Sequence, residues 1–419
     1  MNLSGFLWTM KYVRGRKNNT SDPARPVILV SCGKQKLDYS APAKDLYISR
    51  RFRAARKFAE NFGSNWFILS AKHGLVAPDQ VLDPYDQDLN LLTARAKNLW
   101  VETIVTGLLK CNLVSRYLVV LATGAYGELL RERLRQEEFL VIYPLSDISE
   151  DIHADILERV NANPDRLSHY NRFYNLLWRL QQIPGQMIPF NDFEGKNLPK
   201  AGVYFFFDGR ESTRFFHHET FRVIRIGTHG VSKGSKSLLW QRLRTHRGND
   251  DGSGSHRSSI FRLHVGNAIL ASQKKELTSW GVGDNASKEI RDGEVQLESE
   301  VSQYLRDLRV AYLPVFDEAS VDSDRSYIEK NSISLLTQGG AIDLPSANWL
   351  GNFSNSKNVR NSGLWNVNYV GDNYDPEFLN VFEKLIAKYE KGKISTKSLA
   401  PVNWRLNMLR GSIGQNELF

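Results

Sequence analysis

The sequence predicts an α/β protein in which an N-terminal parallel-sheet domain is joined by a helical connector to a C-terminal α+β domain. Two observations carry this prediction. Between residues 27 and 143, short continuously apolar runs alternate with segments of helical spacing, which is typical of a parallel sheet covered on both faces. Beyond residue 190, two neighbouring strand-like runs are followed by mostly helical segments, which favours an α+β arrangement.

Length and composition narrow the class of protein. The chain has 419 residues, 41% of them hydrophobic and 24% charged, which is typical of a folded protein of roughly two to three domains. Its two cysteines exclude a disulfide framework and a four-cysteine zinc site. No apolar run approaches the ~20 residues that cross a bilayer. Because the positive charges follow the apolar start instead of preceding it, we expect no secretory signal, no membrane partner and a cytoplasmic location.

The N-terminal domain is expected over residues 26–146, after a flexible leader at 1–25. Its arrangement is Rossmann-like, because each buried run is followed by a helix that can return the chain to a parallel neighbour. The predicted strands are Val27–Val30, Trp66–Leu69, Tyr117–Leu121 and Phe139–Tyr143, and the predicted helices are Ser49–Phe62, Thr93–Lys110 and Gly127–Glu138.

The connector is expected over residues 147–190 as two helices that meet at Asn163-Pro164. The C-terminal domain follows at 191–370, and a last helix with a polar tail occupies 371–419. Predicted here are strands at Gly202–Phe207, Phe221–Ile226 and Ile260–Val265, helices at Leu238–Arg247, Glu298–Leu308, Ser326–Thr337 and Pro376–Glu390, and a loop at Gly351–Gly363.

The net charge indicates a class of partner. Lysine and arginine number 55 against 46 aspartates and glutamates, which gives +9 at pH 7. A basic balance favours a polyanion, most simply nucleic acid, although many globular proteins are mildly basic without binding one.

An ordered set of motifs in the C-terminal domain carries the functional prediction. The set is Gly202-Val203-Tyr204, Arg225-Ile226-Gly227, Arg242 and His246 on the predicted helix, Glu329, and Asn348 in Pro345-Ser-Ala-Asn348. In this order the set resembles the GIY-YIG nuclease family over roughly residues 195–350. Two departures stand out. Arg225 occupies the place where the second family motif has tyrosine, and the gap between the two strand motifs is longer than usual.

The resemblance implies an endonuclease that hydrolyses phosphodiester bonds with Mg²⁺ (or Mn²⁺) held by Glu329. Tyr204 would act on the attacking water as general base or orienting group, and Arg242 would contact the scissile phosphate. His246 lies four residues after Arg242, so both would project from one helix face toward the same phosphate. Asn348 would support the site, and Arg225 would contact the substrate. Each residue alone also has an ordinary structural reading: strand packing for Tyr204, a solvated helix position for Arg242, and a first-turn acid for Glu329.

A second set of residues follows the strands of the N-terminal domain. In an open parallel sheet, ligands bind beyond the carboxyl ends of the strands. Lysines there would attract a phosphate, tyrosines would offer stacking faces, and an acid would accept from ring nitrogens. The candidates are Ser31, Cys32, Lys34, Lys36, Ser70, Lys72, His73, Asp86 and Tyr126, with Tyr85 beside them.

This half, with its Ser31-Cys32-x-Lys34-x-Lys36 and Ala71-Lys72-His73-Gly74-Leu75 segments, resembles an uncharacterised bacterial domain family related to archaeosine synthase and other deazaguanine-handling enzymes. The resemblance implies recognition of a nucleobase, or its excision by a glycosylase-like reaction. Cys32 also reads as a small buried residue, and His73 as a loop residue that satisfies its own backbone.

Together the two halves predict a metal-dependent DNA endonuclease coupled to a domain that senses or excises a base, which would suit restriction of foreign modified DNA and antiviral defence. Two alternatives stay open at this point. The nuclease-like domain could bind nucleic acid without cutting it, or the α/β domain could modify RNA bases and use the second domain for docking.

Overall fold

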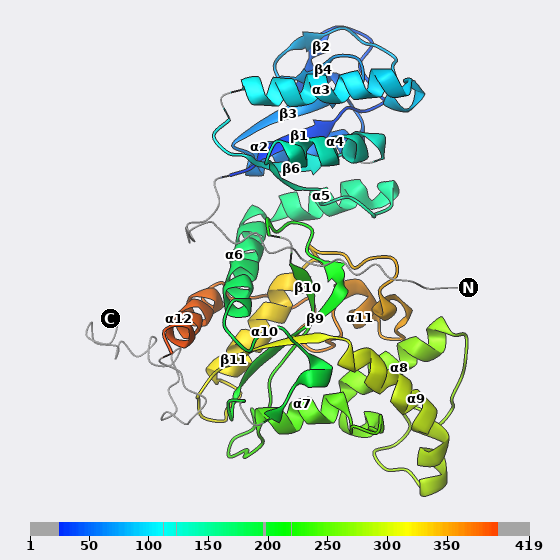
Figure 1. The fold of residues 1–419 in the computed structure, drawn as a ribbon, viewed down its shortest axis with the longest axis vertical. Coiled ribbons are helices and arrows are strands. Elements are labelled where there is room, and N and C mark those ends of the chain that lie inside the picture. The colour runs from blue at the N-terminus through cyan, green and yellow to red at the C-terminus, as the bar shows by residue number, and fades with distance from the viewer. Residues whose placement is uncertain (1–24, 112, 123, 196–197, 219, 393–419) are drawn as a thin grey trace, which may run out of the picture.

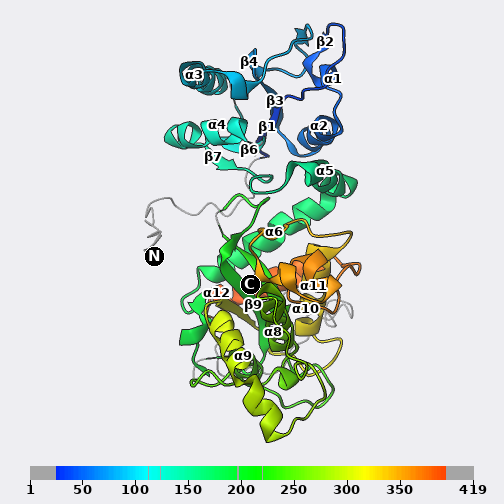
Figure 2. The same cartoon turned by 90° about the vertical axis from the view of Figure 1, so that its right-hand side faces the viewer.

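The computed structural model describes residues 25–392 except 112, 123, 196–197 and 219. Two α/β parts are stacked along the long axis of the molecule, and α5 (His153–Ala162) lies between them (Figures 1 and 2). Apart from Arg25, the expected leader lies outside the described residues, as does the expected tail after residue 392.

The N-terminal part is a five-stranded sheet in the order β4-β3-β1-β6-β7. Its strands are β1 (Val27–Ser31), β3 (Asn65–Ser70), β4 (Gly74–Val76), β6 (Tyr117–Leu121) and β7 (Leu140–Ile142). The four predicted strands are confirmed and parallel. The sequence pattern missed β4, an antiparallel edge strand that follows a tight turn ending at Gly74, where φ is +72°. A two-stranded ribbon of β2 (Ala41–Pro42) and β5 (Val81–Leu82) lies outside this sheet.

Helices cover both faces of this sheet, as the pattern predicts. They are α1 (Ala43–Leu46), α2 (Arg50–Phe62), α3 (Ala94–Lys110) and α4 (Ala125–Gln136), with a 3₁₀ turn at Leu89–Leu91. Alternate residues of β1 point to opposite sides. Ile28 and Val30 belong to the core shared with α2 and α5, whereas Val27 and Leu29 belong to the core under α3 and α4. Burial on both faces explains why these strands are continuously apolar.

The two helices predicted for the connector are present, but they pack on different parts. α5 lies against α2, where Asn161 donates to the Ala54 carbonyl at 2.9 Å. α6 (Pro164–Gln181) lies against the C-terminal sheet, where the Tyr174 hydroxyl accepts from the backbone N–H of Val223 at 3.2 Å. The chain therefore passes from one part to the other at the turn between these helices.

The C-terminal part is built on an antiparallel sheet in the order β10-β9-β11-β8. Its strands are β8 (Ile188–Pro189), β9 (Gly202–Ser212), β10 (Phe221–Gly227) and β11 (Arg309–Pro314). Side chains alternate along β9: Val203 and Phe205 pack on one face, and Tyr204 and Phe206 on the other. The first face is covered by α6, α10 (Asp324–Thr337) and α12 (Phe378–Glu390). The second is covered by α7 (Leu239–Arg247), α8 (Ile260–Ser272) and α9 (Lys288–Arg306).

The predicted strand at Ile260–Val265 is wrong, because this segment begins α8. Residues 261–265 alternate in polarity as a strand does, but Ser259 caps a helix by accepting from the backbone N–H of Arg262 at 3.3 Å. Phe261 and Val265, one helical turn apart, are then buried together. The cap and the contacts of α8 outweigh the local alternation.

The structure also contains elements that the sequence pattern did not predict. The sequence pattern missed β11, although this strand lies inside the sheet between β9 and β8. It also missed the N-terminal half of α9. The segment predicted as the loop Gly351–Gly363 contains most of a 3₁₀ turn (Leu350–Phe353) and all of α11 (Lys357–Ser362), which Ser356 caps. Short 3₁₀ turns also occur at Glu150–Ile152, Phe190–Asp192 and His256–Ser258.

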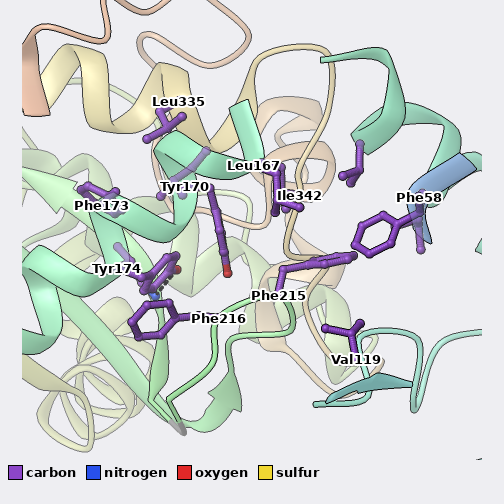
Figure 3. Close-up of a cluster of buried hydrophobic side chains, with 14 of the residues drawn as sticks. Phe58, Val119, Leu167, Tyr170, Phe173, Tyr174, Phe215, Phe216, Leu335 and Ile342 are labelled. Carbon is purple, nitrogen blue, oxygen red and sulfur yellow. Dashed lines mark hydrogen bonds between the residues drawn. The ribbon is translucent and has the colours of Figure 1, made fainter. Parts of the chain in front are cut away.

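The loop between β9 and β10 joins the two parts through aromatic side chains. Phe215, in this loop, lies beside Phe58 of α2 with ring centroids 6.0 Å apart, and Val119 of β6 faces the same contact (Figure 3). Phe216 packs on Tyr174 of α6 at 5.8 Å. The long gap between the two strand motifs therefore forms the hydrophobic contact that holds the parts together.

Candidate functional site

Tyr204 is placed at the start of β9, on the face covered by α7 and α8. Its cross-strand partner is Gly227, the last residue of β10. A Cβ atom on Gly227 would lie only 2.3 Å from the Tyr204 hydroxyl oxygen, so the phenol occupies the space that any other residue at 227 would fill. The glycine of the second motif is required here by this close approach.

His246 lies against Tyr204 and does not reach the surface. Its Nε2 is 3.0 Å from the Tyr204 hydroxyl, and its Nδ1 is 2.8 Å from Ser259 Oγ. The side chain is fully buried, so the expectation that it projects with Arg242 toward one phosphate is wrong. Burial, followed by the charges of nearby arginines, holds the pKa of His246 well below its usual value, and the imidazole is therefore neutral.

Arg225 is brought onto the same face by a β-bulge. The pairing of β10 with β9 shifts between Val223 and Arg225, so that Arg225 lies opposite Phe206 and turns toward α8. Its guanidinium lies 4.6 Å from the Phe261 ring centre and donates to the Trp365 carbonyl at 2.7 Å. Burial lowers its pKa.

Arg225 is also the residue that links the site electrostatically. The hydroxyl of Tyr204 and the carboxylate of Glu329 raise its pKa against the effect of burial, and Arg242 lowers it further. These side chains from β9, β10, α7 and α10 therefore meet around one guanidinium, although they are up to 125 positions apart in the sequence.

Glu329 approaches from α10, past the end of β10. Burial raises its pKa to about 7, although Arg225, the backbone N–H of Thr228 and Arg242 all lower it. Among the described residues no basic group lies within 4 Å of this carboxylate as an ion pair. Glu329 is thus a largely desolvated acid without a close counter-ion, in a site that already holds two arginines.

Arg242 lies on α7 and is partly exposed, unlike His246 one turn later. Its charge acts on Glu329 and Arg225. The loop between β10 and α7 presents Lys233 and Lys236 to solvent, and exposed Lys200 adjoins it through the backbone bond from Leu239 to its carbonyl. These three lysines are therefore exposed on segments that adjoin α7, the helix that carries Arg242.

Asn348 is not brought to the cluster. It lies in an exposed turn just after Ser346, which is anchored on Glu211 at the opposite end of β9 from Tyr204. A different asparagine holds the edge of the site: Asn366 accepts from the N–H of Ile226 at 3.0 Å and donates to its carbonyl at 2.8 Å. Nothing local in the sequence distinguishes Asn366, because its role depends on a non-regular segment running beside β10.

The N-terminal candidates also converge, around Cys32. Its sulfur is 3.3 Å from the Tyr126 hydroxyl, while the Tyr85 hydroxyl bonds Ser70 Oγ at 2.7 Å and the Tyr47 hydroxyl at 2.9 Å. Burial, and then the nearby thiol, raise the pKa of Tyr85 and of Tyr126, so both phenols are neutral donors.

Basic side chains border this N-terminal cluster. The ammonium of Lys36 lies 4.5 Å from the Tyr85 ring centre and that of Lys72 at 5.6 Å, and the His73 ring contacts the same tyrosine edge-on. Ser31 is buried and accepts from Arg51 at 2.6 Å. Lys34 and Asp86 are exposed, and no described contact ties their side chains to Cys32. The sequence pattern missed Tyr47 and Arg51, since neither follows a strand.

Comparison with known proteins identifies the C-terminal part. Residues 164–392, more than half of the chain, match the GIY-YIG domain family. The chain belongs to this family. The Tyr204 cluster lies within the matched residues, and membership of this family supports a nuclease domain that binds nucleic acid.

The matched GIY-YIG segment begins at α6 and ends after α12, which agrees with the packing of both helices on the C-terminal sheet. Residues 27–159 match a family of unknown function, DUF6884. Because that family has no assigned function, the match lends no support to a relationship with archaeosine synthase.

One curated relative and no solved structure match the chain. The uncharacterized protein YfjM of Bacillus subtilis strain 168 is 37% identical over 60 residues, which cover 13% of this chain and 40% of that protein. No solved structure matches. None of the helices within the described ranges is both long and apolar enough to span a membrane.

Proposed function

We propose that the cluster of Tyr204, Arg225, Arg242 and Glu329 hydrolyses phosphodiester bonds of DNA. The observation that supports this proposal is the position of Glu329, a partly buried carboxylate on which Arg225 and Arg242 act electrostatically, while the hydrogen-bonded Tyr204 acts on the same Arg225. Phosphodiester hydrolysis needs an acid that binds a metal cation, cationic side chains that contact the phosphate, and a group such as a phenol that acts on the attacking water.

The residues fit a single divalent cation at Glu329. No group of three or more histidine, cysteine, aspartate or glutamate side chains gathers in the described part of the chain, so the protein would supply one carboxylate. Mg²⁺ is commonly held by one or two carboxylates together with waters and substrate phosphate oxygens. The raised pKa of Glu329 also indicates a carboxylate that a cation would stabilise. When bound, the metal would neutralise charge on the phosphate and on the leaving oxygen.

The chain's own groups would do the remaining work. Arg242 is partly exposed and would contact the scissile phosphate with its planar donors. Tyr204 would accept a hydrogen bond from the attacking water. Exposed Lys200, Lys233 and Lys236 would contact the neighbouring backbone phosphates.

The N-terminal cluster would recognise a nucleobase in the same DNA. Supporting this are the neutral phenol donors of Tyr85 and Tyr126 and the lysines Lys36 and Lys72 at the sheet's carboxyl edge. A base sensor joined to a nuclease suits restriction of foreign modified DNA in the cytoplasm.

The nuclease is tested on supercoiled plasmid DNA with Mg²⁺ or with EDTA. We expect Mg²⁺-dependent nicking by the wild type and by Glu318→Gln, which alters an exposed carboxyl, and none by Glu329→Gln. Equal nicking by Glu329→Gln would refute the role of Glu329. Binding without nicking by the wild type would leave a DNA-docking domain.

Base recognition is tested by comparing phage DNA that carries modified bases with ordinary host DNA. We expect faster cleavage of one of the two, and loss of that preference in Tyr85→Ala with nicking retained. Equal rates on both DNAs would refute the sensor. Chromatography of the same reactions for free base tests excision, for which the comparisons offer no support.

A further inference from the structure

The strand order of the N-terminal sheet reverses at β1. The chain passes from β1 to β3 on one side of it and later returns to β6 on the other side. In open parallel sheets, ligands bind beyond the carboxyl ends of the strands at such a reversal. Cys32 follows β1 and Tyr126 follows β6, and the Cys32 sulfur is 3.3 Å from the Tyr126 hydroxyl. These two strand ends, with the residues that follow them, form the β1–β6 edge.

Arg51 of α2 bridges the β1–β6 edge. Its Nη2 donates to Ser31 Oγ at 2.6 Å, where β1 ends, and to the Leu121 carbonyl at 3.4 Å, where β6 ends. The start of α2 is fixed by a helix cap, because the Ser49 side chain accepts from the backbone N–H of Phe52 at 3.3 Å. The guanidinium is therefore held at the point where the two strands end.

The charge of Arg51 has no close counter-ion in the described part of the chain. Arg50 and Arg56, on the same helix, each form ion pairs with acidic side chains. Arg51 donates only to two neutral oxygens, and its buried Nε has no hydrogen-bond partner among the described residues. Burial lowers the pKa of Arg51, against the effect of the Glu150 charge. Because a partly buried cation without a paired anion is costly, an anion that binds beside it is favoured.

Other groups at the β1–β6 edge suit a phosphate and the nucleoside attached to it. Gly124, just before α4, has φ +51°, and no described atom beyond its chain neighbours lies within 4 Å of the place that a Cβ would take. A ligand can therefore approach the backbone there. The neutral phenol of Tyr126 can donate to a phosphate oxygen. Lys36 and Lys72 lie beside Tyr85, which bonds the last residue of the adjacent β3.

We propose that the β1–β6 edge binds the phosphate group of a nucleotide, with Arg51 as its counter-ion and Tyr126 as a second donor. The inference deepens the proposed base recognition, and it rests on that proposal for the nucleoside part of the ligand. Arg51 would keep its bonds to the two strand ends and direct Nη1, which donates to no described group, to the phosphate. A bare nucleobase would leave this charge uncompensated, so the phosphate contributes to affinity together with the base.

Alkylation of Cys32 by iodoacetamide reports occupancy of this edge in the full-length protein. Cys111, the other cysteine, is an internal control, because it follows the end of α3 and precedes β6, at the opposite edge of the sheet. By mass action, a ligand at about four times its Kd slows alkylation of Cys32 about fivefold. We expect this protection from deoxynucleoside 5′-monophosphates and, at higher concentration, from inorganic phosphate, but not from the matching nucleosides. Mass spectrometry of the two cysteine peptides measures both rates.

A charge-removing variant tests Arg51 itself. Arg51→Gln loses the charge, while its side-chain amide can still donate to Ser31 and to the Leu121 carbonyl. We expect it to lose the protection of Cys32, and Arg53→Gln, at an exposed position on the same helix, to keep it. Protection retained in Arg51→Gln would overturn the proposal. Equal protection by nucleosides and monophosphates would overturn it as well, and that comparison uses the wild type, so it holds even where the variant does not fold.

Oligonucleotides without terminal phosphates distinguish the two sources of the nucleotide. Protection by single-stranded oligonucleotides, lost in Arg51→Gln, would assign a nucleotide within DNA, and protection by monophosphates alone would assign a free nucleotide. Both results support a phosphate site, whereas no protection by any phosphate-bearing probe refutes it. Failure of the proposed function is separate, because a protein that cuts no DNA, or cuts modified and ordinary DNA equally, leaves the alkylation of Cys32 to be measured as before.

Discussion

Glu329→Gln should stabilise the protein at alkaline pH while abolishing cleavage. In the folded chain the pKa of Glu329 is raised from 4.5 to about 7, chiefly by burial. At 1.36 kcal/mol per tenfold change in proton affinity, the ionised carboxylate costs the fold at most about 3 kcal/mol. The partial exposure of the residue and screening by solvent reduce that figure, and glutamine removes the charge with little change in shape.

The sign of the pH dependence follows from the raised pKa. Between pH 4.5 and 7 the folded protein binds more protons at Glu329 than the unfolded chain does, so the free energy of unfolding falls as pH rises through this window. Below pH 4.5 the penalty is absent, and above pH 7 it is complete. We therefore expect Glu329→Gln to exceed the wild type in stability at pH 8 and to equal it at pH 4.5.

Urea unfolding followed by the fluorescence of the nine tryptophans measures this difference. Glu318→Gln, at an exposed carboxyl, is the matched control and should change neither value. Mg²⁺ should raise the stability of the wild type at pH 8 and leave Glu329→Gln unaffected. A variant that is less stable than the wild type at pH 8, or equally shifted at both pH values, would refute the argument that burial strains this carboxylate.

Three further substitutions test the geometry. Arg242→Lys should reduce kcat for plasmid nicking by about 10²-fold or more, because an ammonium cannot supply paired donors to a phosphate, and unchanged nicking would contradict that role. Gly227→Ala places a methyl group 2.3 Å from the Tyr204 hydroxyl, so we expect nicking to be lost and the free energy of unfolding in urea to fall by about 1–3 kcal/mol. The control is Gly209→Ala, whose Cβ would meet nothing nearer than 4.0 Å, and we expect it to change nicking and stability little. Phe215→Ala should lower the free energy of unfolding by about 3–5 kcal/mol in the same assay, whereas Phe353→Ala, at an exposed phenylalanine, should change it little. Equal effects of the two substitutions would show that the aromatic contact between the two parts contributes no stability.

The order of secondary structure could be predicted wherever burial leaves a continuous or periodic pattern. The four parallel strands, their helices and the pair α5–α6 follow from apolar runs and from Asn163-Pro164, since burial on both faces demands apolar residues in sequence. Where a helix cap decides the element, as Ser259 does for α8, alternation misled the prediction. The buried strand β11 was not predicted from the sequence because its six residues follow a helix without a clear break in the apolar pattern.

For the site, the sequence by itself determined which residue types are present and their order; Tyr204 contacts His246, and Arg242 and Glu329 act electrostatically on Arg225. Only the tertiary structure decided how they meet. A one-residue bulge in β10 turns Arg225 to the face of Tyr204, which an alternating pattern cannot foretell. Packing between β9 and α8 buries His246 against Tyr204, 42 positions earlier, and Asn366 instead of Asn348 binds the edge of β10, 140 positions away from its partner Ile226.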